Sequence, residues 1–405
     1  MTAPLPGPDS GPGSAARPRR VAFLFPGQGT KRVHETLRFV ARAAADSVLL
    51  ETARARCEEA ARAAGVQLDH LLRRPSLLDE TEVLQPVLTA VCLAIAECLS
   101  RHGITPNIVL GLSAGEIPAL AAAGGVSIEQ AISLAALRGR LMARQAARHP
   151  GAMAALATSD PAVVERALAI GREAGALEIA AQNGPDETVL TGDVAAVTRM
   201  MRQSEVPTTR IPTPGAWHSA AMEGALSEWR AALDETSISP LRAEMVANRT
   251  GALVPSSPDA PSAIRALLAE QLVRPVEFRR ALFTVRERCD AVVMVGPGAV
   301  LRALWYRNLE GADWTGLAGL HVPNRPDAAR PPQKENNHPD TTSGARHDEP
   351  SPAAVPGVTP AARNDEPSPV ANRRMEGARD KHAHLFDTED ERSLRATIAA
   401  LGGHA

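Results

Sequence analysis

The sequence predicts an α/β fold: a large domain built on a parallel sheet, interrupted by a smaller inserted subdomain and followed by a long polar tail. Short apolar runs that end at glycine-rich turns, separated by stretches with apolar residues at helical spacing, predict the sheet and its helices. From Gly151 onward the sequence pattern changes to short alternating strands and helices, which predicts the subdomain. The chain's 405 residues provide ample length for a large core, at roughly 150 residues per domain.

The first part of the large domain covers residues 20–150. Its expected elements are a buried strand, one or two surface helices, a strongly apolar helix, a second strand and a long helix, at Arg20–Phe25, 33–64, Leu84–Ser100, Ile108–Leu110 and Ser127–Arg148. In the long helix, apolar residues recur mostly at three- to four-residue intervals, which is the spacing of one helix face.

The inserted subdomain covers residues 151–213. Its elements follow the order strand, helix, strand, strand, helix, strand, at Met153–Ala157, Pro161–Ala174, Leu177–Ala181, Thr188–Thr191, Asp193–Gln203 and Thr208–Ile211. That order is typical of a ferredoxin-like subdomain. The large domain then resumes over residues 214–323, and the strand Ala291–Val295 is expected to close it.

Both ends of the chain have a different composition. Residues 1–19 are rich in Pro, Gly and Ser, and residues 324–384 are rich in polar residues and proline without any aromatic residue, so we expect a disordered N-terminus and a disordered linker. Residues 385–405 begin with the capping-box pattern of Thr388 and Glu391. Leu394, Thr397, Ile398 and Leu401 then fall on one helical face, which predicts either a docking helix for a partner or a frayed tail.

Composition excludes several classes of protein. The net charge of −2 and the pI of about 6.6 argue against nucleic-acid or membrane-surface binding. No apolar stretch reaches the roughly 18 residues that a membrane span requires, and the N-terminus lacks the apolar segment of a secretory signal. The cysteines are scattered without metal-ligand spacing. We therefore expect a cytoplasmic enzyme without a metal.

The segment Gly111–Gly115 carries the most informative pattern, a Gly-x-Ser-x-Gly between a predicted strand and a predicted helix. Such a turn projects the serine hydroxyl above the sheet edge, and the next N–H lies at the helix N-terminus, where a developing oxyanion is favoured. Ser113 is therefore a candidate nucleophile. The alternative is an ordinary glycine-serine turn.

A serine nucleophile needs a general base, and His218 is the best candidate. It lies between a predicted strand and a predicted helix, where a side chain can face a cleft. For an isolated histidine, a purely structural role would be the alternative.

Several motifs, in this order, resemble those of malonyl-CoA:acyl carrier protein transacylases and of the acyltransferase domains of polyketide synthases. They are Phe25–Gly29, Gln85-Pro86, Gly111–Glu116, Leu137–Met142, Gly215–Ser219, Val246–Asn248, Gln271–Pro275 and Val295–Gly298. The resemblance extends from about residue 20 to about residue 323. It implies a hydrolase-like large α/β domain.

The resemblance also implies roles for the site residues. Ser113 would attack a thioester carbonyl, and His218 would take its proton and later return it to the leaving thiol. The main-chain carbonyl of Gln271 would orient the histidine in place of an Asp side chain. The main-chain N–H groups of Gln28 and Ala114 would form the oxyanion hole.

Arg138 matches the family arginine that binds the free carboxylate of a malonyl group, and a planar guanidinium can bind a carboxylate through two parallel hydrogen bonds. Arg140, two residues away on another helix face, is the competing candidate. Leu112 and Trp217 stand at expected acyl-pocket positions. The bulk of Trp217 favours unsubstituted malonyl over methylmalonyl.

We expect from the resemblance a ping-pong transfer of malonyl from malonyl-CoA to the phosphopantetheine thiol of an acyl carrier protein, with no bound cofactor. We expect a monomer that acts in trans, in polyketide or fatty-acid synthesis, and whose tail contacts a polyketide synthase module. Two alternatives remain: an editing thioester hydrolase on the same scaffold, and a non-catalytic docking protein. Arg138 argues against the first, and the complete set of Ser113, His218 and Arg138 argues against the second.

Overall fold

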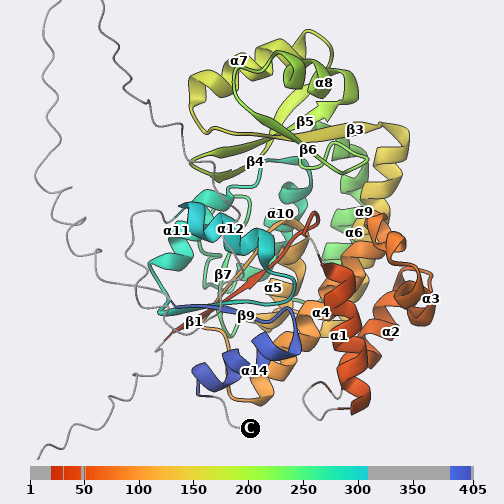
Figure 1. The fold of residues 1–405 in the computed structure, drawn as a ribbon, viewed down its shortest axis with the longest axis vertical. Coiled ribbons are helices and arrows are strands. Elements are labelled where there is room, and N and C mark those ends of the chain that lie inside the picture. The colour runs from red at the N-terminus through yellow and green to blue at the C-terminus, as the bar shows by residue number, and fades with distance from the viewer. Residues whose placement is uncertain (1–19, 31, 47–49, 51, 309–383, 403–405) are drawn as a thin grey trace, which may run out of the picture. The chain divides into compact units, whose positions relative to one another are not determined.

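The computed structural model describes residues 20–30, 32–46, 50, 52–308 and 384–402. Within these residues the chain forms a large domain around a five-stranded sheet and a subdomain around a four-stranded sheet (Figure 1). The predicted α/β class, with a parallel sheet and a small inserted subdomain, is confirmed. The expected disorder of residues 1–19 and 324–383 lies outside the described residues and stays a prediction.

The central sheet is parallel throughout, in the strand order β7-β2-β1-β8-β9. Its strands are β1 (Val21–Phe25), β2 (Ile108–Gly111), β7 (Glu244–Val246), β8 (Ala291–Met294) and β9 (His384–Asp387). Every residue of β1, β2 and β8 is buried, as in parallel sheets that helices cover on both faces. Because Phe25 pairs with Gly111, the turns that follow β1 and β2 emerge side by side.

Helices connect these strands. They are α1 (Val33–Asp46), α2 (Ala53–Ala63), α3 (Leu68–Arg73), α4 (Thr81–Arg101), α5 (Glu116–Ala122), α6 (Ile128–Arg148), α9 (Leu226–Glu235), α10 (Ala260–Val273), α11 (Phe278–Arg286) and α12 (Ala299–Asn308). The long helix α6 begins where it was predicted, because Ser127 caps it: its hydroxyl accepts the N–H of Gln130 at 3.1 Å in a capping box.

Helix α4 corrects one expectation from the sequence. Among the described residues, it is the one helix long and apolar enough to cross a membrane by length and composition, with a mean hydropathy of 1.8 over 18 residues. However, 89% of that window is buried inside the protein. The apolar surface of α4 is therefore the surface of a central core helix.

The subdomain comprises β3 (Gly151–Leu156), α7 (Pro161–Arg172), β4 (Leu177–Gly184), β5 (Glu187–Asp193), α8 (Val194–Gln203) and β6 (Thr208–Ile211). Its strands are antiparallel in the order β4-β5-β3-β6, which is the ferredoxin-like arrangement that the sequence predicted. Alternate residues of β3, Ala152, Ala154 and Leu156, are buried in one cluster with residues of α7 and α8. Figure 1 shows both helices on one face of this sheet.

The chain passes between the large domain and the subdomain at two neighbouring points. Pro150 forms an isolated antiparallel bridge with Gly215, and the N–H of Gly151 donates to the carbonyl of Pro214 at 3.2 Å. The subdomain is therefore inserted into the chain between α6 and the segment that carries His218.

The C-terminal segment differs from the free docking helix or frayed tail that its composition predicted. Residues His384–Asp387, the first of which fell within the expected linker, form the edge strand β9 beside β8, so β8 does not close the sheet. Helix α14 (Glu391–Ala400) follows, and its apolar face is buried: Leu394 is 0% and Ile398 is 7% exposed. The chain's own large domain covers the face that was expected to contact a partner.

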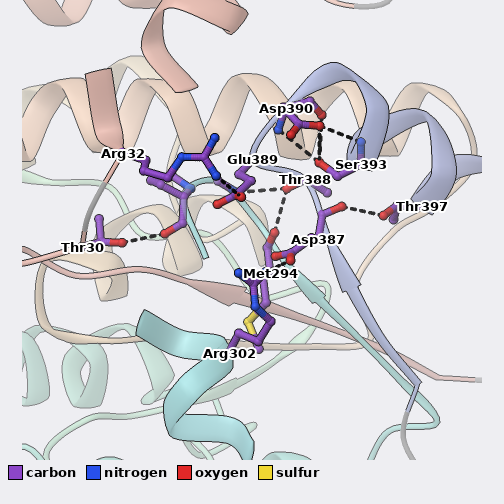
Figure 2. A network of polar contacts seen from close by, with 12 residues as sticks. Thr30, Arg32, Met294, Arg302, Asp387, Thr388, Glu389, Asp390, Ser393 and Thr397 are labelled. Carbon is purple, nitrogen blue, oxygen red and sulfur yellow. Dashed lines mark hydrogen bonds and ion pairs between the residues drawn. The ribbon is translucent and has the colours of Figure 1, made fainter. Parts of the chain in front are cut away.

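Polar contacts also hold this segment to the end of β8 (Figure 2). The hydroxyl of Thr388 donates to the carbonyl of Met294 at 2.7 Å and accepts the N–H of Gly296 at 3.0 Å. Asp387 forms an ion pair with Arg302, and Glu389 forms one with Arg32 at 2.7 Å. The C-terminal residues are thus an integral part of the central sheet and of the turn after β8.

Candidate active site

The turn after β2 holds Ser113 in a strained conformation. Ser113 has φ = 52°, in the left-handed region that costs a non-glycine residue about 1–2 kcal/mol. The turn needs glycine on either side: a Cβ on Gly111 would lie 2.0 Å from the carbonyl of Gly115, and one on Gly115 would lie 2.3 Å from the carbonyl oxygen of Phe25. The Gly-x-Ser-x-Gly pattern is therefore the sharp strand-to-helix turn that was predicted.

Two amide side chains from distant parts of the chain hold the main chain of Ser113. Its N–H donates to Oδ1 of Asn248, just after β7, at 2.7 Å. Its carbonyl accepts a hydrogen bond from Nε2 of Gln271, in α10, at 2.8 Å. These hydrogen bonds offset the strain of the turn, because they exist only when the serine takes this conformation.

His218 lies directly against the serine. Its Nε2 is 2.7 Å from Ser113 Oγ, and its Nδ1 is 2.7 Å from the main-chain carbonyl of Gln271. A carbonyl only accepts, so the proton sits on Nδ1, and the lone pair of Nε2 faces the serine hydroxyl. The carbonyl of Gln271 thus lies where the expected orientation of the histidine requires it, and the orienting role itself stays a prediction.

Burial keeps His218 neutral. Loss of solvation, followed by the nearby charge of Arg138, lowers the pKa of His218 from 6.5 to about 4, although the hydrogen bond to the carbonyl of Gln271 opposes this. The histidine is therefore a free base at neutral pH, as a general base for Ser113 must be.

Arg138 lies on α6, where that helix closely approaches α4. A Cβ on Gly139 would lie 2.8 Å from the carbonyl oxygen of Thr81, so a glycine permits the approach. Arg138 is 2% exposed, and its Nη1 and Nη2 donate to Oε1 of Gln85 and Oε1 of Gln271, each at 2.8 Å. Nη2 also lies 3.5 Å from Ser113 Oγ.

The charge of Arg138 has no anion in contact with it among the described residues. Burial lowers the pKa of Arg138 from 12.5 to about 10, and the carboxylate of Glu116 partly counteracts this. The competing Arg140 is in a different place: its Nη1 donates to the carbonyl of Ala63, at the end of α2, at 3.0 Å. Of the two arginines, Arg138 is the one beside the serine.

Glu116, for which the sequence predicted no role, is 1% exposed and lies beside Gln271 and Asn248. Its carboxylate accepts the N–H of Asn248 and the Nε2 of Gln271, each at 2.7 Å. Burial raises the pKa of Glu116 from 4.5 to about 7, while those two hydrogen bonds and Arg138 lower it. Glu116 and Asn248 lie within motifs that the sequence displays, but their spacing alone does not reveal that they meet.

The loop after β1 lies against the serine turn. A Cβ on Gly27 would be 2.3 Å from the carbonyl oxygen of Leu112, and Nε2 of Gln28 donates to Thr81 Oγ1 at 2.8 Å. Gln28 thus lies beside the turn that contains Ala114. The oxyanion-hole role of their two N–H groups stays a prediction.

The two expected pocket residues differ in their surroundings. Leu112 is half-buried in the serine turn. Trp217 is buried, and its ring lies over Gly215, next to Ala146 of α6. Ala146 is eight residues, or about 12 Å, along the helix from Arg138. These contacts do not place the indole ring at the serine, and its effect on acyl choice stays a prediction.

Among the residues that the structure describes, no group of three His, Cys, Asp or Glu side chains could hold a metal ion. The four cysteines are buried free thiols. The polar groups that converge on Ser113 are one imidazole, one guanidinium and several amides, a set suited to acyl transfer and to binding an anion.

Comparison with known proteins identifies the family of this chain. The acyl transferase domain family matches residues 22–343. The chain is 34% identical over 293 residues to erythronolide synthase EryA3 of Saccharopolyspora erythraea, which is 70% of this chain but 9% of that protein.

Solved structures are similar along most of their length. MCAT from Streptococcus pneumoniae has 23% identity and a TM-score of 0.66, covers 94% of this chain and 99% of its own, and supports the fold. A malonyl-transacylase solved with its type II polyketide synthase acyl carrier protein has 26% identity and a TM-score of 0.64, over 72% of this chain and 93% of that one. On the match over residues 22–343, this chain belongs to the acyl transferase domain family, with the fold of the malonyl-CoA:acyl carrier protein transacylases.

Proposed function

We propose that the protein transfers a malonyl group from malonyl-CoA to the phosphopantetheine thiol of an acyl carrier protein, through an ester on Ser113. The observation that carries the proposal is Arg138: a buried cation 3.5 Å from Ser113 Oγ, held by neutral amides and in contact with no anion among the described residues. A free carboxylate on the acyl group would supply the missing negative charge.

Each half of the reaction moves one proton. Ser113 Oγ attacks the thioester carbonyl while His218 Nε2 takes the hydroxyl proton, and the tetrahedral intermediate then expels the CoA sulfur, which receives that proton. In the second half, the carrier's thiol gives its proton to His218 and attacks the ester, and Ser113 recovers its hydroxyl proton. The main-chain N–H groups of Gln28 and Ala114 would stabilise the oxyanion, at about 2.7–4 kcal/mol for such a donor.

The second substrate follows from the similarity to known proteins. A similar structure is a malonyl-transacylase bound to its carrier protein, and the curated relatives are polyketide synthases. These similarities support polyketide or fatty-acid synthesis as the setting of the reaction. We propose in addition that the protein is a cytoplasmic monomer that serves its carrier protein in trans.

Brief incubation with malonyl-CoA, followed by intact-protein mass spectrometry, tests the proposal. We expect a malonyl adduct on the wild type, none on Ser113→Ala, and much less on Arg138→Ala. Arg140→Ala is the matched control, since it removes an arginine from the same helix without changing the site, and it should label like the wild type. Labelling by acetyl-CoA alone, or equal labelling of Arg138→Ala, would overturn the assignment of malonyl.

A second incubation, with the holo carrier protein, separates transfer from hydrolysis. A transferase loses its adduct to the carrier faster than to water, and an editing hydrolase loses it to water without a carrier. A non-catalytic docking protein would show no adduct.

A further inference from the structure

Behind Arg138, the side-chain amide of Gln271 separates a buried cation from a buried anion. Gln271 Oε1 accepts a hydrogen bond from Arg138 Nη2 at 2.8 Å, and Gln271 Nε2 donates to Glu116 Oε2 at 2.7 Å. The other oxygen of Glu116 accepts the main-chain N–H of Asn248 at 2.7 Å. Arg138 and Glu116 therefore interact through an amide and form no direct ion pair.

The partners of this amide determine its orientation. A guanidinium only donates, and both oxygens of Glu116 face N–H donors, as an ionised carboxylate requires. The oxygen of Gln271 must therefore face Arg138, and its NH₂ group must face Glu116. The NH₂ group also donates to the carbonyl of Ser113 at 2.8 Å. A flipped amide would place N–H against N–H at Arg138, and all of these groups are buried, where unpaired polar groups are costly.

The amide also leaves Arg138 available. A carboxylate in direct contact could take both N–H groups of the guanidinium edge and cancel its charge. The oxygens of Gln85 and Gln271 instead hold Arg138 by single hydrogen bonds at 2.8 Å and carry no charge. Glu116, the anion that balances the buried guanidinium, is separated from it by the side chain of Gln271.

We infer that Glu116 is a positioning residue for substrate selection: through the amide of Gln271, it holds Arg138 in place and free for the carboxylate of the acyl donor. This inference rests on the proposed function, because it requires that Arg138 bind that carboxylate. It assigns Glu116 no contact with the reacting atoms.

Glu116→Gln tests the inference, since it removes the charge at nearly constant volume. The fixed N–H of Asn248 still needs an acceptor, so the new amide turns its oxygen there and its NH₂ toward Gln271. Two NH₂ groups then face each other, and a flip of Gln271 that relieves this presents its own NH₂ to Arg138 and its oxygen to the Ser113 carbonyl. Acylation of Ser113 is measured with malonyl-CoA and with p-nitrophenyl acetate, a neutral donor that has no use for Arg138.

Both donors lose the hydrogen bond from Gln271 Nε2 to the Ser113 carbonyl, but only malonyl-CoA also loses the position of Arg138. We therefore expect kcat/KM for malonyl-CoA to fall about tenfold more than that for the neutral donor, the effect of losing one hydrogen bond to a charged group. Glu228→Gln is the matched control, because Glu228 forms an exposed ion pair with Arg144, and it should change neither rate. If Glu116→Gln lowers both donors equally, or neither, the inference is overturned.

The double variant Glu116→Gln with Gln271→Glu keeps the inference testable even if the single variant folds poorly. It restores donor–acceptor pairing between positions 116 and 271 and toward Arg138, although it loses the hydrogen bond to the Ser113 carbonyl, and it places the negative charge directly against Arg138. We expect the melting temperature to return toward the wild-type value while malonyl-CoA acylation stays low. Recovery of both would mean that Glu116 is only structural.

The wild-type control separates the two proposals. If malonyl-CoA does not acylate the wild type, the proposed function itself fails. If it does, and the ratio of malonyl-CoA to neutral-donor rates is the same in Glu116→Gln, only the role of Glu116 fails.

Discussion

Leu394 tests whether helix α14 is part of the large domain or a tethered segment that waits for a partner. Its side chain is 0% exposed, on the apolar face of α14 that also contains Ile398. Replacing a fully buried leucine with alanine removes its transfer free energy and leaves a cavity, which together cost about 2–5 kcal/mol. That is a large part of a typical total stability of about 5–15 kcal/mol.

The assay is thermal unfolding of Leu394→Ala, followed by circular dichroism. Since 1 kcal/mol shifts Tm by about 2–4 °C in domains of 150–250 residues, we expect Tm to fall by about 4 °C or more. Arg392→Ala, an exposed position on the same helix, is the control and should stay within about 1 °C of the wild type. Equal melting temperatures for the two variants would refute the packing of α14 on the large domain.

The same pair of variants distinguishes packing from docking. If α14 were a free docking helix, Leu394→Ala would leave Tm unchanged and slow transfer to the carrier protein. A chain that ends at residue 383 gives a larger effect, because β8 loses its neighbour β9 and Thr388 leaves the turn at Gly296. We expect that chain to melt earlier than Leu394→Ala, contrary to the tolerance that a purely flexible tail would show.

Three further predictions concern the site. Because the pKa of His218 is lowered to about 4, its base form persists in acid, and acylation by a neutral ester should lose half its rate near pH 4; a midpoint near 6.5 would contradict this. Gly139→Ala, whose Cβ would lie 2.8 Å from a main-chain oxygen of α4, should displace Arg138 and raise KM for malonyl-CoA severalfold. Gly103→Ala, whose only cost is about 1–2 kcal/mol for a left-handed backbone conformation, should not change that KM. Equal KM values for the two variants would argue against the displacement of Arg138. Asn248→Ala should slow acylation by every donor about tenfold, because the N–H of Ser113 and the turn around it lose a partner; an unchanged burst of p-nitrophenol would contradict it.

Some of the fold was readable from the sequence because its signals are local. The apolar runs of β1, β2 and β8 and the capping box of α6 lie within a few residues each, and the observed bounds fall within a few residues of the predicted ones. Strands β7 and β9 gave no such signal, because each lies at an edge of the sheet and lacks the continuous apolar run of the inner strands. Their place depends on pairing with strands far away in the chain.

The predictions for the site divide in the same way. The serine turn and the arginine helix were predicted, because residue type and motif order point to them. Glu116, and the double use of Gln271 through its main chain and its side chain, were not found. A buried carboxylate next to a glycine turn looks, in a sequence, like any acidic residue in the first turn of a helix.

The sequence by itself predicted the chemistry proposed for this protein: a serine in a sharp turn, a histidine base and an arginine for an anionic acyl group, because these predictions depend on residue type within short motifs. Only the tertiary structure decided how the arginine is held, which groups balance its buried charge, and that the last residues of the chain complete the central sheet. The physical reason is that hydrogen-bond partners and burial are properties of packing. Ser113 lies more than 100 residues from both Asn248 and Gln271 and meets them only once the sheet has formed.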